Sequence, residues 1–184
     1  LVSDEIYHGI TYGVPSVSSL EVHSQSLVIN SFSKYFSMTG WRLGWMIVPD
    51  DLIRPIECLA QNFFISAPTH SQLAAIAAFD SYQDAEKNVK RYARNRSILM
   101  NELPAAGITN IAPPDGAFYV YADISNLTDS SEKFCKDMLR DIGVACTPGL
   151  DFDPLRGDFT VRLSFAGSDS DIREACKRLK NWLR

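Results

Sequence analysis

Lys34 stands apart from the other lysines of the sequence because hydroxyl-bearing residues surround it. It follows the apolar run "SLVIN" in the stretch "NSFSKYFSMTGWRLGW", with Ser31 and Ser33 before it and Arg42 eight positions after it. A buried strand that ends there would deliver Lys34 to the carboxyl edge of a sheet, where open α/β folds bind ligands. A lysine amine partly removed from water can act as a nucleophile, a base or a Schiff-base partner. Two serine hydroxyls and a guanidinium suit a phosphate monoester.

Composition alone favours a simpler interpretation. Most lysines and arginines are solvated surface charges, so Lys34 could be an exposed loop residue and Arg42 a surface cation. The wider pattern of the stretch decides between the two.

"SFSKYFSMTGWRLGW" resembles the lysine signature of the fold type I pyridoxal-phosphate enzymes, and specifically of the class I/II aminotransferases. The matching features are Ser-x-x-Lys, an arginine eight residues after the lysine, and then Gly44 after one apolar residue. The resemblance implies that Lys34 is catalytic and forms a Schiff base with pyridoxal 5'-phosphate. It also implies that Ser31, Ser33 and Arg42 bind the cofactor's phosphate.

A second match lies upstream in "SDEIY". It resembles the family's Asp-x-x-Tyr at the end of a sheet strand, which would place Asp4 at the pyridine nitrogen and Tyr7 at the ring's 3'-oxygen. A carboxylate there keeps the nitrogen protonated and makes the ring a better electron acceptor. A strand-end Asp that caps a turn would explain Asp4 alone, but not the spacing of Asp4, Tyr7 and Lys34.

A third match lies near the end of the chain in "FTVRLSFA". It resembles the small-domain strand whose arginine binds the substrate's α-carboxylate, and that arginine would be Arg162. The planar guanidinium matches a carboxylate with two hydrogen bonds. An arginine within an apolar strand is costly unless it is paired, which argues against a random surface charge.

The elements that must position these residues change character along the chain. Short apolar runs bounded by Gly, Pro, Ser or Asn predict strands up to about residue 49, and "SLVIN", without alternation, predicts a strand covered on both faces. Helical patterns follow, ending in an amphipathic helix over about residues 84–103. Strands and helices then alternate as in an α+β unit, with Ser168 or Ser170 as N-cap of the last helix.

The resemblance gives this pattern a fold and a division into domains. It implies an α/β fold, namely the C-terminal part of the pyridoxal-phosphate-dependent transferase fold. Residues 1–83 would be the later part of the cofactor-binding large domain with its mixed sheet, residues 84–104 a connecting helix, and residues 105–184 an α+β small domain.

Composition restricts the partners. The 184 residues carry a net charge of −4 without a basic run, which disfavours nucleic acid and anionic membranes and favours a small-molecule partner. The four cysteines (Cys58, Cys135, Cys146 and Cys176) lack metal or disulfide spacing, so we expect packing residues in a cytoplasmic protein and no metal site. No apolar run reaches the length of a membrane span.

The sequence starts within an apolar strand pattern and matches only the later half of a family member. The family's Gly/Ser/Thr-rich phosphate loop, its ring-stacking aromatic residue and its N-terminal segment have no counterpart in the 184 residues. We therefore expect an incomplete fragment with little activity alone, from a homodimer with its active site at the subunit interface. The expected substrates are an L-amino acid and a 2-oxo acid, and whether the amino acid is aspartate, aromatic or another stays open.

Two alternatives remain. Another fold type I reaction, such as a β-lyase, could use the same lysine, aspartate and arginine, because fold does not fix function. A non-catalytic aminotransferase-like sensor domain of a regulator would keep the motifs without turnover.

Overall fold

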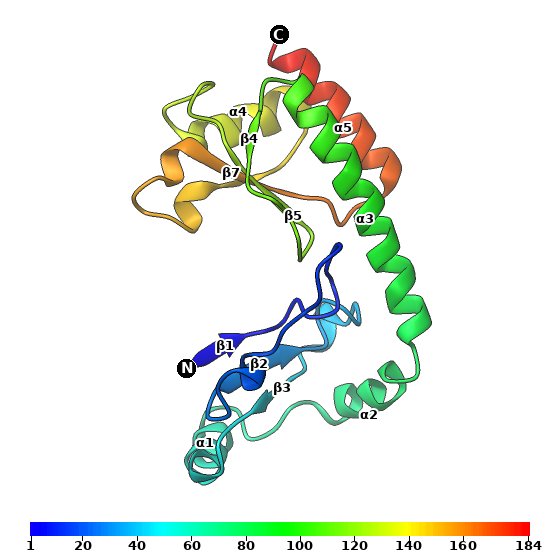
Figure 1. The fold of residues 1–184 in the computed structure, drawn as a ribbon, viewed down its shortest axis with the longest axis vertical. Coiled ribbons are helices and arrows are strands. Elements are labelled where there is room, and N and C mark those ends of the chain that lie inside the picture. The colour runs from blue at the N-terminus through cyan, green and yellow to red at the C-terminus, as the bar shows by residue number, and fades with distance from the viewer. The chain divides into compact units, whose positions relative to one another are not determined.

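The computed structural model describes residues 1–184, and its first part is built on a three-stranded mixed sheet (Figure 1). Strand β1 (Val2–Asp4) is parallel to β2 (Leu27–Ser31), and β2 is antiparallel to β3 (Gly44–Ile47). Asp4 pairs in register with Ile29, and Ser31 pairs with Gly44. Because β1 and β2 are parallel, the residues that follow Asp4 and Ser31 leave the same edge of the sheet.

Two helices follow this sheet, α1 (Asp50–Phe63) and α2 (Thr69–Ala78), and two short 3₁₀ turns, η1 (Ser19–Glu21) and η2 (Thr39–Trp41), interrupt the loops. Phe32 lies at the centre of the local core, with its ring centroid 4.9 Å from that of Trp45 and 5.3 Å from that of Phe36. Phe32 and Phe36 flank Lys34 in sequence. Burial of these rings therefore fixes the turn that carries the lysine.

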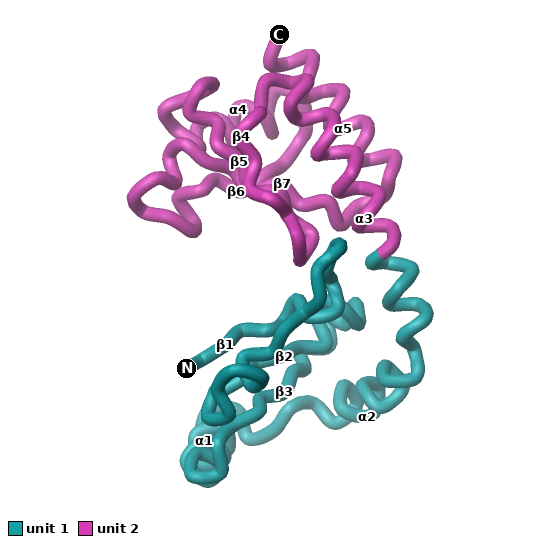
Figure 2. Tube along the Cα trace, viewed as in Figure 1, with its two compact units in different colours: residues 1–89 teal, residues 90–184 magenta.

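The long helix α3 (Tyr82–Ala105) runs from the first compact unit, residues Leu1–Val89, into the second, residues Lys90–Arg184 (Figure 2). It ends close to Gly107, whose φ of +94° favours glycine. None of the helices combines the length and the apolar character that crossing a bilayer requires.

The second unit contains a four-stranded antiparallel sheet with the order β4-β5-β7-β6. Its strands are β4 (Asn110–Ile111), β5 (Tyr119–Asp123), β6 (Thr147–Pro148) and β7 (Thr160–Ser164), and its helices are α4 (Ser131–Ile142) and α5 (Asp169–Trp182). The 3₁₀ turns η3 (Gly149–Asp151) and η4 (Gly157–Phe159) connect β6 to β7. Alternate residues of β5 and β7 form the core together with apolar residues of the helices; those least exposed include Val120, Ala122, Val161, Phe165, Met138 and Leu103.

The mixed α/β architecture agrees with the fold class expected from the sequence. Ser168, one of the two candidate caps, accepts a hydrogen bond from the Asp171 backbone N–H at the start of α5. Two local expectations need correction. Within the expected alternation of strands and helices, residues 144–149 ("VACTPG"), which the sequence pattern predicts as a strand, form only the two-residue strand β6. The run "SLVIN" is expected to be covered on both faces, but of the apolar residues in β2 only Val28 is buried within this chain.

Candidate functional site

Lys34 lies in the turn that follows β2, and its Nζ stands 5.5 Å from the centroid of the Tyr7 ring. Tyr7 follows β1, so the parallel pairing of β1 with β2 brings the two residues to one sheet edge. The lysine is half-buried rather than solvated. Tyr7 and Lys34, which the sequence analysis joined by motif spacing alone, are therefore neighbours.

A close contact between Gly9 and Tyr35 fastens the Tyr7 loop to the Lys34 turn. Gly9 has a φ of +86°, and a Cβ placed there would lie 2.5 Å from Cδ2 of Tyr35. The Tyr35 hydroxyl donates a 2.6 Å hydrogen bond to Oε1 of Glu86. Burial raises the pKa of Tyr35, and the Glu86 carboxylate raises it further. A side chain at position 9 would both strain the backbone and displace the Tyr35 ring.

Ser31, Ser33 and Arg42 are joined by a short series of hydrogen bonds through Thr39. The Ser33 N–H donates to Ser31 Oγ at 3.0 Å, and Thr39 Oγ1 donates to the Ser33 carbonyl at 2.7 Å. Arg42 Nη1 donates to the Thr39 carbonyl at 2.9 Å. Arg42 is exposed and pairs with no carboxylate, so the hydroxyl and guanidinium groups of the segment that carries Lys34 have no competing carboxylate. This set of donors is chemically suited to a phosphate.

Asp4 ends β1 at the same edge. Its Oδ1 accepts a 3.3 Å hydrogen bond from the Ile6 N–H, and its side chain is exposed. The expected role at a pyridine nitrogen needs a carboxylate that is accessible and that lies at this sheet edge. Asp4 is exposed and ends β1, so it meets both requirements.

Glu5 is a residue that the sequence analysis missed. Its side chain is buried at 5% exposure and accepts hydrogen bonds from the Ser19 N–H at 2.8 Å and from Ser18 Oγ at 3.2 Å, with Nδ1 of His8 at 3.3 Å. Burial alone would raise its pKa, but the hydrogen bonds from Ser19, Ser18 and Ser3 and the nearby His8 outweigh burial and lower it. Glu5 thereby ties the loop that carries Tyr7 to η1.

Arg162 belongs to the second unit and lies in β7, where it pairs in register with Tyr121 of β5 and Thr147 of β6. Its guanidinium carbon lies 4.3 Å from the centroid of the Tyr119 ring and 4.3 Å from that of Phe152. No carboxylate forms an ion pair with it. The aromatic faces stabilise the half-buried cation while leaving its carboxylate-binding capacity unused.

Tyr119 and Phe152 were not identified from the sequence. Tyr119 lies on the neighbouring strand β5, two residues from the partner of Arg162, and Phe152 directly follows η3. A weak signal existed, because aromatic residues on strands neighbouring an arginine can stack on its guanidinium. Strand register, which the sequence does not reveal, was needed to choose them.

The lysine turn at a mixed-sheet edge and the stacked arginine of an antiparallel sheet define the class of the chain, that of fold type I transferases. The sequence model of the family described as "Aminotransferase class I and II" matches residues 1–179. The chain belongs to this family.

Individual relatives agree. Over its whole length the chain is 50% identical to the valine–pyruvate aminotransferase of Mycobacterium tuberculosis and 33% identical to the aspartate aminotransferase of Sulfurisphaera tokodaii, covering 48% of each. It also superposes on the crystal structure of an aminotransferase from Mycobacterium tuberculosis with a TM-score of 0.95 and 50% identity, over 99% of this chain and 48% of that one. The chain thus spans about half the length of these relatives.

Proposed function

We propose that the chain supplies the catalytic lysine and the substrate-binding arginine of a pyridoxal-phosphate-dependent aminotransferase. The reaction moves an amino group between an L-amino acid and a 2-oxo acid. The observation that carries the proposal is the half-buried amine of Lys34 over the Tyr7 ring, beside hydroxyl and guanidinium donors, in a chain of the aminotransferase family.

The residues present suit the cofactor. Ser31, Ser33 and Arg42 would hold the phosphate of pyridoxal 5'-phosphate, since Arg42 has no competing carboxylate. Tyr7 would bind at the ring's 3'-oxygen, and Asp4 at the ring nitrogen. Bound there, the cofactor supplies an aldehyde that condenses with amines and a ring that accepts electrons from the substrate's α-carbon.

Lys34 has two tasks in this proposal. Its amine would hold the cofactor through the aldehyde that the cofactor supplies. With an amino acid bound, the same amine would take the proton from the substrate's α-carbon and give it back to a neighbouring carbon, as a general base and acid. The Tyr7 ring beneath Nζ limits where the amine can move.

Arg162 orients the substrate. Its guanidinium binds the α-carboxylate with two parallel hydrogen bonds, and Tyr119 and Phe152 hold the guanidinium plane from their ring faces. A carboxylate fixed in this way sets which bond at the α-carbon is aligned for cleavage.

The proposal includes a homodimer with its active site at the subunit interface. It is supported by the exposed apolar residues of the first unit, which include Phe63 at 80% and Ile65 at 83% exposure. Relatives about twice as long share this half, so we propose that residues 1–184 alone turn over substrate poorly. A cytoplasmic location stays a prediction of the sequence.

Borohydride reduction tests the proposal directly. The protein is incubated with pyridoxal phosphate, reduced and mapped by peptide mass spectrometry. We expect the pyridoxyl adduct at Lys34, and no selective adduct in Lys34→Arg, while Lys87→Arg, which alters an exposed lysine paired with Asp84, keeps the label. Labelling spread evenly over surface lysines would contradict the proposed site.

Product analysis identifies the reaction. The 50% identity to a valine–pyruvate aminotransferase makes valine and pyruvate the first pair to test. Alanine and the 2-oxo acid of valine are the expected products. Ammonia and pyruvate from a β-substituted amino acid would instead indicate a lyase. Cofactor binding without turnover in a protein of the relatives' full length would favour a sensor.

A further inference from the structure

Two cysteines of the second unit lie within reach of each other. Sγ of Cys135, in α4, and Sγ of Cys146, directly before β6, are 3.2 Å apart. All four cysteines of the chain are free thiols. The sequence spacing predicted only packing roles, so this pairing is a feature that the fold creates.

A tight reversal of the chain brings the pair together. Helix α4 ends at Ile142, and Gly143, with a φ of +65°, turns the chain back with its N–H bonded to the Leu139 carbonyl at 3.1 Å. Three residues after Gly143 the chain reaches Cys146. The short connection leaves little freedom for the two sulfurs to separate.

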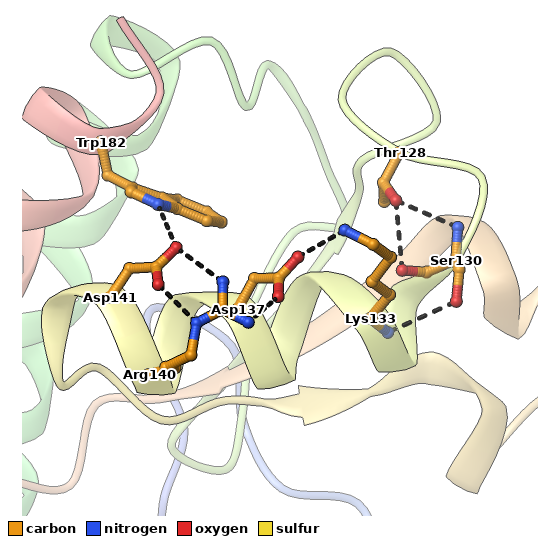
Figure 3. A network of polar contacts seen from close by, with 7 residues as sticks. All are labelled: Thr128, Ser130, Lys133, Asp137, Arg140, Asp141 and Trp182. Carbon is orange, nitrogen blue, oxygen red and sulfur yellow. Dashed lines mark hydrogen bonds and ion pairs between the residues drawn. The ribbon is translucent and has the colours of Figure 1, made fainter.

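The exposed face of α4 is also fixed (Figure 3). Its first turn is capped by Ser130, which accepts a hydrogen bond from the Lys133 N–H. Further along the helix, four residues form a chain of ion pairs and hydrogen bonds that reaches Trp182 of α5; they are Lys133, Asp137, Arg140 and Asp141. Cys135, at 8% exposure, therefore lies on a helix whose exposed face is fixed by these ion pairs and hydrogen bonds.

The contact makes the two thiols chemically unequal. The two thiols share a hydrogen bond in which either sulfur can be the donor. This hydrogen bond lowers the pKa of Cys135, although burial and the Asp151 carboxylate oppose the change. The same hydrogen bond, together with burial, raises the pKa of Cys146. The first proton therefore leaves Cys135, and the thiolate is the nucleophilic form of cysteine.

We propose that Cys135 and Cys146 are a redox-active dithiol, which a hydroperoxide converts into an intrachain disulfide between α4 and the residue before β6. One thiol attacks the peroxide and becomes a sulfenic acid as water, or the alcohol of an organic peroxide, leaves. The second thiol then attacks the sulfenic sulfur, the S–S bond forms, and the sulfenic hydroxyl leaves as water together with the proton of that thiol. The two thiols lose two electrons and two protons in total, and the peroxide O–O bond accepts them.

The geometry favours this product over competing ones. The sulfurs need to approach from 3.2 Å to the bond length of about 2.05 Å, a movement that side-chain rotation and a small shift of the residues before β6 can supply. Cys176 is buried on α5, and burial raises its pKa to about 11. Cys58 lies on α1 in the first unit.

The inference goes beyond the proposed transamination and does not depend on it. The disulfide would tie α4 to the edge strand β6, whose Thr147 pairs in register with Arg162. Its test is read from the thiols alone, so a failure of the aminotransferase proposal would leave the result unchanged.

Peptide mapping under native conditions tests the pair. The folded protein is treated with hydrogen peroxide, its remaining thiols are blocked with N-ethylmaleimide, and it is digested with trypsin. We expect the free thiols to fall from four to two, and peptides 134–136 and 141–156 to appear joined by a disulfide. Dithiothreitol should restore all four thiols.

Single substitutions supply the controls. Cys58→Ser should give the same joined peptides, whereas Cys146→Ser should give none and leave Cys135 to oxidise alone. The proposal is overturned if native wild-type protein keeps four thiols, if oxidation stops at sulfinic acid on Cys135, or if joined peptides appear only after denaturation.

Discussion

The two units hold their functional residues by different means. Lys34 is placed at an open sheet edge by contacts that are mostly close in sequence, in a unit that leaves Phe63 and Ile65 at 80% and 83% exposure. Arg162 lies on the inner strand β7 of a four-stranded antiparallel sheet, next to Val161 at 1% and Leu163 at 8% exposure. In the first unit polar bonds position the amine that we propose to be reactive, and in the second unit packing positions the guanidinium.

This difference shows what each position demands. In the proposed role Lys34 releases and recaptures a proton, and the rings of Phe32 and Phe36 fix the turn that carries it. An arginine that only orients a carboxylate gains from rigidity, which the strand and two aromatic faces supply. We therefore expect activity to depend on the chemical nature of the group at position 34 and on the geometry of the charged group at position 162.

Lys34→Arg should have the largest effect. Arginine keeps the positive charge but cannot condense with an aldehyde or accept a proton near neutral pH, so amine transfer should fall by at least about 100-fold. The measurement is the rate of 2-oxo acid formation relative to the unsubstituted protein, both carried in a protein of the relatives' full length, with Lys87→Arg as the matched control. Turnover within a few-fold of the unsubstituted rate would remove Lys34 from the catalytic role.

Arg162→Lys should come second. Loss of the bidentate, charge-assisted contact costs about 1.5–3 kcal/mol, which corresponds to a rise of about 10- to 100-fold in the KM for the amino acid. Arg156→Lys, in the same unit and paired with Asp153, is the control and should leave KM unchanged. An equal response to both substitutions would mean that net charge, and not the fork of Arg162, binds the substrate.

The sequence predicted the first position better than the second, for a physical reason. Ser31, Ser33, Lys34 and Arg42 share one strand end and turn, so their linear spacing nearly determines their neighbourhood. The aromatic partners of Arg162 and the Cys135–Cys146 contact arise from strand register and chain reversal between separate elements. Periodicity located those elements but carried no information on which side chains would meet.

Glu5 lies between these two cases, because it follows the Asp4 motif directly while its partners Ser18 and Ser19 come from η1. The sequence shows that Glu5 lies beside the Asp4 motif, but only the fold shows that it bonds to Ser18 and Ser19.

Glu5→Gln should weaken the loop that carries Tyr7 by about 1–3 kcal/mol, because charge-assisted hydrogen bonds to Ser18 and Ser19 become neutral ones. The folded protein lowers the pKa of Glu5, so its contribution is present above the ordinary value of 4.5 and is lost as pH falls through the lower folded pKa. Urea unfolding at neutral and acidic pH should therefore show the variant and the wild type converging in acid. Glu57→Gln, at an exposed ion pair, should change neither curve, and a constant difference across pH would rule out the titration of Glu5 as the cause.

Phe152→Leu should have the smallest effect and tests the role of packing around Arg162. Leucine keeps an apolar side chain at the end of η3 but removes one of the two ring faces 4.3 Å from the guanidinium carbon. A lost cation–π contact is worth about 0.5–1 kcal/mol at a partly exposed site, so the KM for the amino acid should rise about two- to fivefold with kcat little changed. Phe159→Leu, the same substitution on the same connection between β6 and β7, should leave KM unaltered. If both variants raise KM equally, the loop rather than the aromatic face controls the arginine, and the second unit then resembles the first in relying on its loops.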